Sequence, residues 1–234
     1  MNGLFVTGTD TGVGKTLVAS ALLHAFGRRG LRTVGMKPVA AGAMETGNEW
    51  RNDDVDALVA AGNVTAPRDE INPYAFAPAI APHLAAIDAG VTIDIDTIAE
   101  RFRSLAGRAD MVVVEGAGGF LVPLNARHSF ADVAVRLGLP VVLVVGMRLG
   151  CLNHALLSAA AIRARGLVLA GWVANRIDAA MLRYEDNRDT LVRLLEAPLI
   201  ADIPWLAQAD PARVVVDTRG LIDRPAAQRS GGPD

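Results

Sequence analysis

The stretch LFVTGTDTGVGKTL, residues 4–17, decides the fold that this chain adopts. A short apolar run leads into a glycine-rich loop, which ends in Gly-Lys-Thr and opens an amphipathic segment. In this strand–loop–helix context, backbone N–H groups of the loop and the first turn of the helix converge on phosphate oxygens. The stretch therefore predicts a nucleotide site. A glycine-rich turn before a capped helix is the alternative that this context disfavours.

The glycines of this loop depart from the general pattern G-x-x-x-x-G-K-[ST]. That pattern places a glycine at position 9, where the chain has Thr9, and it does not require Gly12. We still expect Gly12 and Gly14 to bring backbone N–H groups to phosphate. Lys15 is expected to contact the β- and γ-phosphates, and the Thr16 hydroxyl to ligate Mg²⁺. The phosphate-binding half of the motif is therefore present, while its first half differs.

Outside the loop, short apolar runs alternate with longer amphipathic segments. The runs are rich in Val, Leu and Ile without polar alternation, which is typical of strands covered on both faces. The predicted strands lie at 4–8, 32–39, 111–116, 140–146, 167–175 and 198–203, and the predicted helices at 15–30, 53–62, 96–107, 129–138, 151–165 and 179–196. This order predicts a three-layer α/β fold of the phosphate-loop NTPase type, with a mostly parallel sheet and helices on both faces.

The length and composition favour a single large domain. The chain has 234 residues, of which 51% are hydrophobic, enough for one α/β core that we place at 1–223. The last segment, 224–234, has the composition of a flexible tail. Residues 40–95 are rich in Gly, Pro and Asn, which predicts long loops that are functional or mobile.

Charge and cysteine content exclude several classes of protein. A formal net charge of -2 gives no general attraction to nucleic acid or to anionic membranes. The single cysteine, Cys151, excludes an internal disulfide framework. The sequence shows neither a secretory signal nor a run of about 18 apolar residues. We therefore expect a cytoplasmic protein without a nucleic-acid or membrane partner.

Two further strand ends carry charged side chains. Glu115 ends the run at 111–116 and is placed like the carboxylate that completes a Mg²⁺ site in phosphate-loop enzymes. Lys37 ends the run at 32–39, where it could neutralise a transferred phosphoryl group, although a lone lysine there is more often a solvated charge. Because ligands of open parallel sheets bind beyond the carboxyl ends of the strands, we expect both residues near the loop.

Two other motifs leave alternatives open. Asp54, in RNDDVDAL, lies at the start of a predicted helix, where the helix dipole alone explains an acid. VANRID, residues 173–178, resembles the N-K-x-D element with which GTPases read guanine, but Arg176 replaces the lysine. Contact between Asn175 and a nucleobase stays open, and guanine specificity is disfavoured.

Several blocks, taken together and in order, resemble the dethiobiotin synthetase family. They are FVTGTDTGVGKT, KPVAAG, RNDD, VEGAGG, VVLVVGMRLGCLNHALL, AGWVAN and DIPWL, and they extend over residues 3–206. The resemblance implies a cyclo-ligase of biotin synthesis that forms C–N bonds. Its reaction would close a ureido ring on 7,8-diaminononanoate (7,8-diaminopelargonate) with CO₂, ATP and Mg²⁺, through a carbamate and a carbamic–phosphoric anhydride. It also implies a homodimer with its site at the subunit interface.

The resemblance further implies which residues form the site. The catalytic residues would be Lys15, Lys37 and Thr11, and the Mg²⁺ ligands Thr16, Asp54 and Glu115. ATP would bind to Gly12, Val13, Gly14, Lys15, Thr16, Leu17, Asp54, Glu115, Gly116, Ala117, Gly118, Asn175, Arg176, Pro204, Trp205 and Leu206. The second substrate would bind to Thr11, Lys37, Ala41 and Gly118 and, across the dimer, to Gly150, Cys151, Leu152 and Asn153 at a helix start.

Two positions depart from the pattern of this family. In KPVAAG, Ala41 stands where the family commonly has Ser or Thr, so that a hydroxyl contact with the substrate is lost or replaced. In VGMRLG, Arg148 replaces a frequent lysine, which leaves the charge unchanged. Neither departure touches the residues expected to transfer the phosphoryl group.

Two other classes of protein carry related glycine-rich loops. Partition or septum-placement ATPases, whose dimers switch on DNA or membrane with nucleotide, typically have a lysine in the loop before Gly12, where this chain has Asp10 and Thr11. Amidoligases of cobalamin synthesis are normally much longer chains. Asp10 and Thr11 are instead expected to face a diamine, so that one loop serves two ligands.

Overall fold

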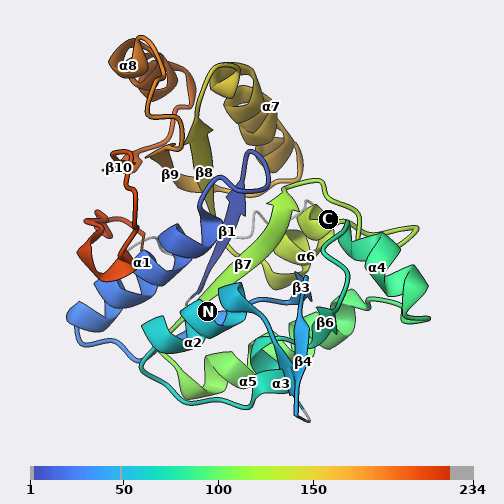
Figure 1. Cartoon of the computed structure of the whole chain (residues 1–234). Coiled ribbons are helices and arrows are strands. Elements are labelled where there is room, and N and C mark those ends of the chain that lie inside the picture. The colour runs from blue at the N-terminus through green and yellow to red at the C-terminus, as the bar shows by residue number, and fades with distance from the viewer. Residues whose placement is uncertain (1–2, 48, 222–234) are drawn as a thin grey trace, which may run out of the picture.

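The computed structural model describes residues 3–47 and 49–221, and a six-stranded sheet forms its centre (Figure 1). The strand order is β10–β9–β8–β1–β7–β2. The strands are β1 (Gly3–Gly8), β2 (Thr33–Met36), β7 (Met111–Gly119), β8 (Val141–Met147), β9 (Leu169–Arg176) and β10 (Leu199–Ile203). Every neighbouring pair is parallel, which confirms the predicted sheet and places all the carboxyl ends of its strands at one edge.

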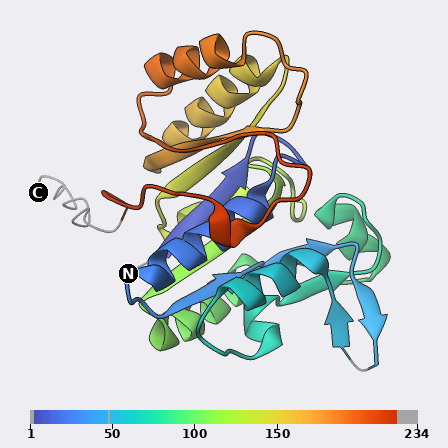
Figure 2. The same ribbon diagram turned by 60° about the vertical axis from the view of Figure 1, so that its left-hand side comes forward.

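Helices cover both faces of this sheet, as predicted. On one face, α1 and α2 pack beside the C-terminal segment, which includes the short turn η1, and Figure 2 shows α1 crossing the front of the sheet. On the other face lie α5, α6 and α7, with α8 packed against α7. The helices are α1 (Lys15–Arg28), α2 (Asp53–Ala61), α5 (Ile95–Arg108), α6 (Phe130–Leu137), α7 (Cys151–Ala164), α8 (Tyr184–Leu194) and η1 (Pro211–Arg213).

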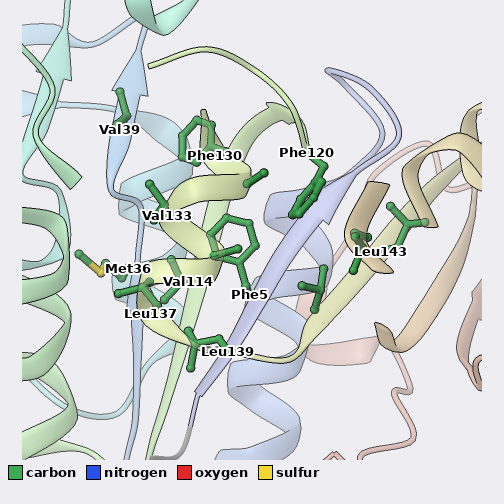
Figure 3. Packing of buried hydrophobic residues seen from close by; sticks show 14 of the residues in the cluster. Phe5, Met36, Val39, Val114, Phe120, Phe130, Val133, Leu137, Leu139 and Leu143 are labelled. Carbon is green, nitrogen blue, oxygen red and sulfur yellow. The ribbon is translucent and has the colours of Figure 1, made fainter. Parts of the chain in front are cut away.

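Successive side chains of the central strands enter two different hydrophobic cores. In β1, Phe5 enters the core under α5 and α6, whereas Leu4 and Val6 enter the core under α1. Phe5 faces Phe130 of α6, with 6.5 Å between their ring centroids, and Val133 lies beside them (Figure 3). Because both faces of the strand are buried, its sequence carries no polar alternation.

The predicted strand at 32–39 is divided in the structure. Strand β2 ends at Met36, and β3 (Val39–Ala41) leaves the main sheet to pair with β6 (Tyr74–Phe76). The division has a physical cause, since the Lys37 N–H donates to Ile71 O and Pro38 has no N–H to donate. The sheet edge therefore ends at Lys37, whose side chain is free to point toward the loop.

Apart from the helix near 53–62, the sequence predicted long loops at 40–95, and this prediction is wrong. This region also contains β3, the hairpin of β4 (Met44–Thr46) and β5 (Glu49–Arg51), α3 (Arg68–Ile71), β6 and α4 (Pro82–Asp88). Strands of three residues and helices of four or seven residues are too short to show a hydrophobic period, so the Gly, Pro and Asn between them dominate the sequence pattern.

Two predictions concern the chain as a whole, whereas the structure describes only part of it. The expected tail at 224–234 lies outside these residues, so the division into a domain at 1–223 and a tail stays a prediction. Among the described residues, no helix combines the length and the apolar composition that crossing a membrane requires.

Candidate active site

Hydrogen bonds of Asp10 stabilise the glycine-rich loop between β1 and α1. Lys15 Nζ donates to Asp10 O at 3.0 Å, and the Asp10 carboxylate accepts from Thr11 N at 2.7 Å and from Arg148 at 2.6 Å. Gly14 precedes α1 with φ of +90°, and no side chain of the described residues caps this helix. The first N–H groups of α1 are therefore available to an anion at the carboxyl edge of the sheet.

Asn175, at the carboxyl end of β9, fixes the loop from the other side. Its Nδ2 donates to Val13 O at 2.8 Å, and the side chain is buried. A Cβ atom added to Gly14 would lie 2.3 Å from this Nδ2. Strand β9 and the loop thus fit so closely that only glycine can occupy position 14 without displacing Asn175.

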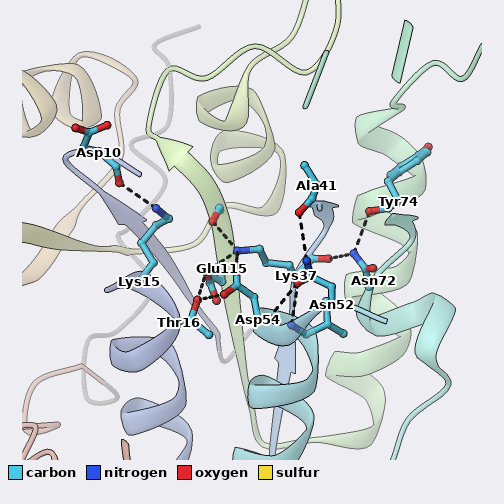
Figure 4. A network of polar contacts seen from close by, with 12 residues as sticks. Asp10, Lys15, Thr16, Lys37, Ala41, Asn52, Asp54, Asn72, Tyr74 and Glu115 are labelled. Carbon is cyan, nitrogen blue, oxygen red and sulfur yellow. Dashed lines mark hydrogen bonds and ion pairs between the residues drawn. The ribbon is translucent and has the colours of Figure 1, made fainter. Parts of the chain in front are cut away.

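Four charged or polar side chains meet below the loop: one each from α1, α2 and β7, and Lys37 from directly after β2 (Figure 4). The Thr16 hydroxyl lies 2.8 Å from Asp54 Oδ1 and 2.9 Å from Glu115 Oε1. Lys37 Nζ donates to Asp54 Oδ2 at 2.8 Å and to Glu115 Oε1 at 2.5 Å. Packing of α1 and α2 at the carboxyl ends of β2 and β7 thus joins residues that are up to 99 positions apart.

The charges of this cluster depend on one another. Burial alone would lower the pKa of Lys37, but its ion pairs with Glu115 and Asp54 outweigh burial and hold this pKa above its ordinary value. Burial raises the pKa of Glu115, so its ionised form depends on the cations around it. Burial and the nearby Lys37 lower the pKa of Lys15. The pKa of Asp54 falls below its ordinary value, because Lys37 and Thr16 outweigh its partial burial.

The oxygen atoms of this cluster suit Mg²⁺. Thr16, Asp54 and Glu115 present a hydroxyl and two carboxylates to one point, and Mg²⁺ prefers a few such ligands together with water and phosphate. Glu115 Oε2 is buried and has no hydrogen-bond partner among the described residues. A buried oxygen without a partner is costly, and a cation is one group that would satisfy it. The described residues contain no group of three or more His, Cys, Asp and Glu side chains that could hold another metal.

Asn52 positions Asp54 from outside this cluster. It is the N-cap of α2, and its Oδ1 accepts from Asp54 N at 3.1 Å and from Val55 N at 3.3 Å. Its Nδ2 donates to Ala41 O at 3.2 Å. One side chain therefore caps the helix that carries Asp54 and ties that helix to β3. No pattern in the sequence singled out this second contact.

Substitution of Asn52 should separate these two contacts. Asn52→Ala removes the cap, and we expect the free energy of unfolding to fall by about 1–2 kcal/mol. Asn52→Ser keeps an oxygen that can cap α2 but cannot reach Ala41 O, so its loss should be about half as large. Urea unfolding followed by tryptophan fluorescence measures both values. Equal losses in the two variants would show that the cap does not account for the effect.

A cavity of about 750 Å³ opens between the loop and α4. Residues expected at the site form most of its lining, namely Thr11, Gly12, Gly14, Lys15, Thr16, Lys37, Ala41, Asp54, Glu115, Ala117 and Gly118. No motif in the sequence pointed to the apolar wall of Ala79, Ile80, Ala81 and Pro82, or to Val122, which lies beside Gly118. The only signal for this wall was the composition of residues 40–95, which indicated a functional segment without naming residues.

Comparisons with known proteins place the chain in a family. A family model described as an AAA domain matches residues 2–213. The ATP-dependent dethiobiotin synthetase BioD of Aromatoleum aromaticum is 54% identical over 215 residues, which cover 92% of this chain and 96% of that protein. The chain belongs to the dethiobiotin synthetase family. As such it is an ATP-dependent ligase that forms a C–N bond, as the resemblance in its sequence implied.

Solved structures confirm the phosphate-loop NTPase fold. The MinC:MinD complex of Aquifex aeolicus matches with a TM-score of 0.52 at 18% identity, covering 88% of this chain and 83% of that one. The septum site-determining protein MinD of Pyrococcus horikoshii, solved with Mg-ADP, matches with a TM-score of 0.51 at 18% identity, covering 90% and 82%. Identity this low shows a shared fold alone, so these structures give no evidence that the chain is a septum-placement ATPase.

Some residues that the dethiobiotin synthetase family implies lie outside the cavity lining. Val13 and Gly116 are buried behind it, and Leu17 packs on the core under α1. Asn175 pairs in register with Ile203, which directly precedes Pro204, Trp205 and Leu206, so the four residues expected around adenine share one edge. Arg176 instead stacks on Tyr184, 4.9 Å from the ring centroid. Gly150, Cys151, Leu152 and Asn153 lie at the start of α7.

Proposed function

We propose that this chain closes the ureido ring of dethiobiotin on 7,8-diaminononanoate, using CO₂ and ATP with Mg²⁺ and releasing ADP and phosphate. The observation that carries the proposal is the arrangement of the cavity. The phosphate loop forms one wall, an apolar segment with Ala81 and Pro82 forms the other, and Lys37 with its carboxylates lies between them. An anionic nucleotide and an aliphatic diamine would meet where these walls converge.

Lysine side chains of the cavity would hold two anions, the γ-phosphate of ATP and a carbamate, in position to react. One amine takes up CO₂ as a carbamate, whose oxygen attacks the γ-phosphorus and expels ADP. Lys15 and Lys37 would hold the γ-phosphate and the carbamate together, because two negative groups otherwise repel each other. Bound Mg²⁺, held by Thr16, Asp54 and Glu115, would neutralise charge on the phosphates. The second amine then attacks the carbonyl carbon of the carbamic–phosphoric anhydride and expels phosphate.

The substrate side of the cavity has little polar character. Thr11 is exposed on the loop, where it would contact both the phosphates and the diamine. Ala41 contributes a methyl group, and its carbonyl already accepts from Asn52. The hydroxyl contact that the family commonly makes at this position is therefore lost, and Thr11, Lys37 and the N–H groups around Gly118 would orient the diamine.

A second copy of the chain would complete the substrate site. Helix α7 begins at Cys151 after Gly150 and has no side-chain cap among the described residues, so its first N–H groups can receive a carboxylate. This helix start does not line the cavity of its own chain. Leu149, directly before it, is 95% exposed, so a partner chain could reach this end of the helix. A homodimer would bring this helix start to the distant carboxylate of diaminononanoate.

The orientation of Asn175 favours adenine as the base. One N–H of Nδ2 donates to Val13 O, and this bond fixes the orientation of the amide, whose Oδ1 accepts hydrogen bonds. The exocyclic amine of adenine donates at the position where guanine carries an accepting oxygen. Asn175 Oδ1 would therefore accept from the exocyclic amine of adenine, a bond that the oxygen of guanine cannot supply. The same contact explains why Arg176, which stacks on Tyr184, is not needed to read the base.

Nucleotide selectivity should depend on this one side chain. We expect wild type to use ATP with a kcat/KM at least about tenfold above that for GTP. Asn175→Ala should raise the KM for ATP by about tenfold and reduce the preference for ATP over GTP. Steady-state kinetics with both nucleotides measure the effect. An unchanged preference in the variant would exclude Asn175 as the base-reading residue.

The function itself is tested by product formation. Purified protein is mixed with diaminononanoate, bicarbonate, ATP and Mg²⁺, and dethiobiotin is detected by mass. Omission of bicarbonate serves as the control, since the carbamate cannot form without a source of CO₂. Product that appears only in the complete mixture supports the proposal. Hydrolysis of ATP without dethiobiotin would refute it.

A further inference from the structure

Lys37 neutralises the two carboxylates that would bind the metal. Its Nζ donates to Asp54 Oδ2 at 2.8 Å and to Glu115 Oε1 at 2.5 Å. The exposed fraction of the Lys37 side chain is 4%, and that of Glu115 is 0%. Protein oxygens therefore neutralise the ammonium, and the ammonium is the main positive charge in contact with Glu115.

The two carboxylates that neutralise this ammonium would also have to neutralise a divalent cation. Mg²⁺ binds oxygen at about 2.0–2.1 Å in octahedral geometry and needs lone pairs of Glu115 and Asp54. Glu115 Oε1 already accepts from both Lys37 and Thr16. An ammonium that kept these contacts would lie beside a doubly charged ion in a desolvated site, where like charges repel strongly.

We propose that Lys37 is the resident counter-ion of the metal-free site, and that binding of a divalent cation displaces its ammonium toward the phosphates and the carbamate. The inference rests on the proposed function, since it concerns the same ligands, Thr16, Asp54 and Glu115. Without any cation, a buried carboxylate would stand unneutralised next to a second one, at a large cost in free energy. Lys37 removes this cost until the metal arrives.

Two further contacts fit this exchange. Glu115 Oε2 is buried without a partner among the described residues, so the ammonium leaves unused a lone-pair site that a metal could use. Gly116 O lies 3.5 Å from Lys37 Nζ and is not an expected metal ligand. The ammonium can therefore keep one acceptor while it releases the carboxylates. Binding of the metal would therefore also move the Lys37 ammonium to the position that it needs for catalysis.

Binding of Mn²⁺ to nucleotide-free protein tests the exchange. Free Mn²⁺ is measured by electron paramagnetic resonance at about pH 8, well above the ordinary pKa range of carboxyl groups. Lys37→Met removes the resident cation, and we expect Mn²⁺ to bind about tenfold more tightly than to wild type. Circular dichroism establishes that each variant is folded.

Lys15→Met is the matched control. It removes a lysine from the same cavity, but Lys15 Nζ donates to Asp10 O and contacts neither carboxylate. Its affinity for Mn²⁺ should stay within about threefold of wild type. Equal tightening in both variants would reduce the effect to general electrostatics and overturn the proposal. An affinity of Lys37→Met no higher than that of wild type, including undetectable binding to either, would also overturn it.

Crystals of the wild-type protein give a measurement that needs no variant. With Mn²⁺ present, anomalous scattering should locate the ion among Thr16, Asp54 and Glu115, with Lys37 Nζ beyond hydrogen-bond distance of Glu115 Oε1. An ion at these residues with the Lys37 contact intact, or no ion there, contradicts the exchange. Because neither measurement involves product, failure of the exchange and failure of dethiobiotin formation are separate results.

Discussion

Lys37→Met should lower kcat by about a thousandfold, while the Kd for ATP in the presence of Mg²⁺ stays within about threefold of wild type. The reason is that Lys37 contacts Asp54 and Glu115 and no described residue of the loop. Lys15, the N-terminus of α1 and the Asn175 contact remain to hold the nucleotide. What the variant loses is the charge that brings the γ-phosphate and the carbamate together. Single-turnover kinetics and calorimetry measure the two quantities separately.

Lys15→Met provides the contrast to this result. Lys15 directly follows the loop and its ammonium donates to Asp10 O, so its loss should weaken ATP binding as well as turnover. If Lys37→Met loses as much affinity for ATP as Lys15→Met, then Lys37 binds nucleotide and the role proposed for it is wrong. The two variants carry the same side chain and the same change of charge, which makes the comparison direct.

Gly14→Ala should weaken ATP binding by about a hundredfold or more. Position 14 has φ of +90°, which a residue with a Cβ adopts only under strain, and the new methyl group would lie 2.3 Å from Asn175 Nδ2. Relief of this overlap requires Asn175 to release Val13 O, so the loop and the proposed base-reading residue are displaced together. Fluorescence titration with a labelled ATP analogue measures the loss.

Gly12→Ala is the control for backbone strain in the same loop. Gly12 also has a positive φ, +75°, but a Cβ at this position meets no atom within 4 Å. The variant carries only the strain, and its affinity for ATP should fall by no more than about tenfold. Similar losses in both variants would show that the contact with Asn175 is irrelevant, and would assign the whole effect to backbone conformation.

The parts of the site that the sequence predicted follow one local rule. Glu115 and Lys37 each end an apolar run, and parallel strands bring their carboxyl ends to the same edge. The structure confirms that both lie beside the loop that carries Lys15 and Thr16. The hydrophobic pattern sufficed for these positions because it reports directly on burial within the sheet.

Other parts depend on packing that no local pattern records. An acid at position 54 is explained by the N-terminus of α2, and only the docking of α2 beside α1 brings Asp54 within 2.8 Å of Thr16. The resemblance to the family supplied this ligand, and the residues alone did not. The wall of Ala79, Ile80 and Ala81 carries no charge and no period, so the sequence gives no reason to place it opposite the loop.

β3 leaves the main sheet after Lys37, and from this point the chain forms the substrate side of the cavity. The apolar wall between Ala79 and Pro82, together with Ala41, is encoded between β2 and α5, whereas the phosphate loop and Glu115 are encoded on either side of this insert. A library confined to codons 41 and 79–82 would therefore vary the shape of the substrate chamber and leave the nucleotide machinery untouched. The two variable segments flank α2, so Asp54 keeps its place at the metal site while the shape of the chamber changes.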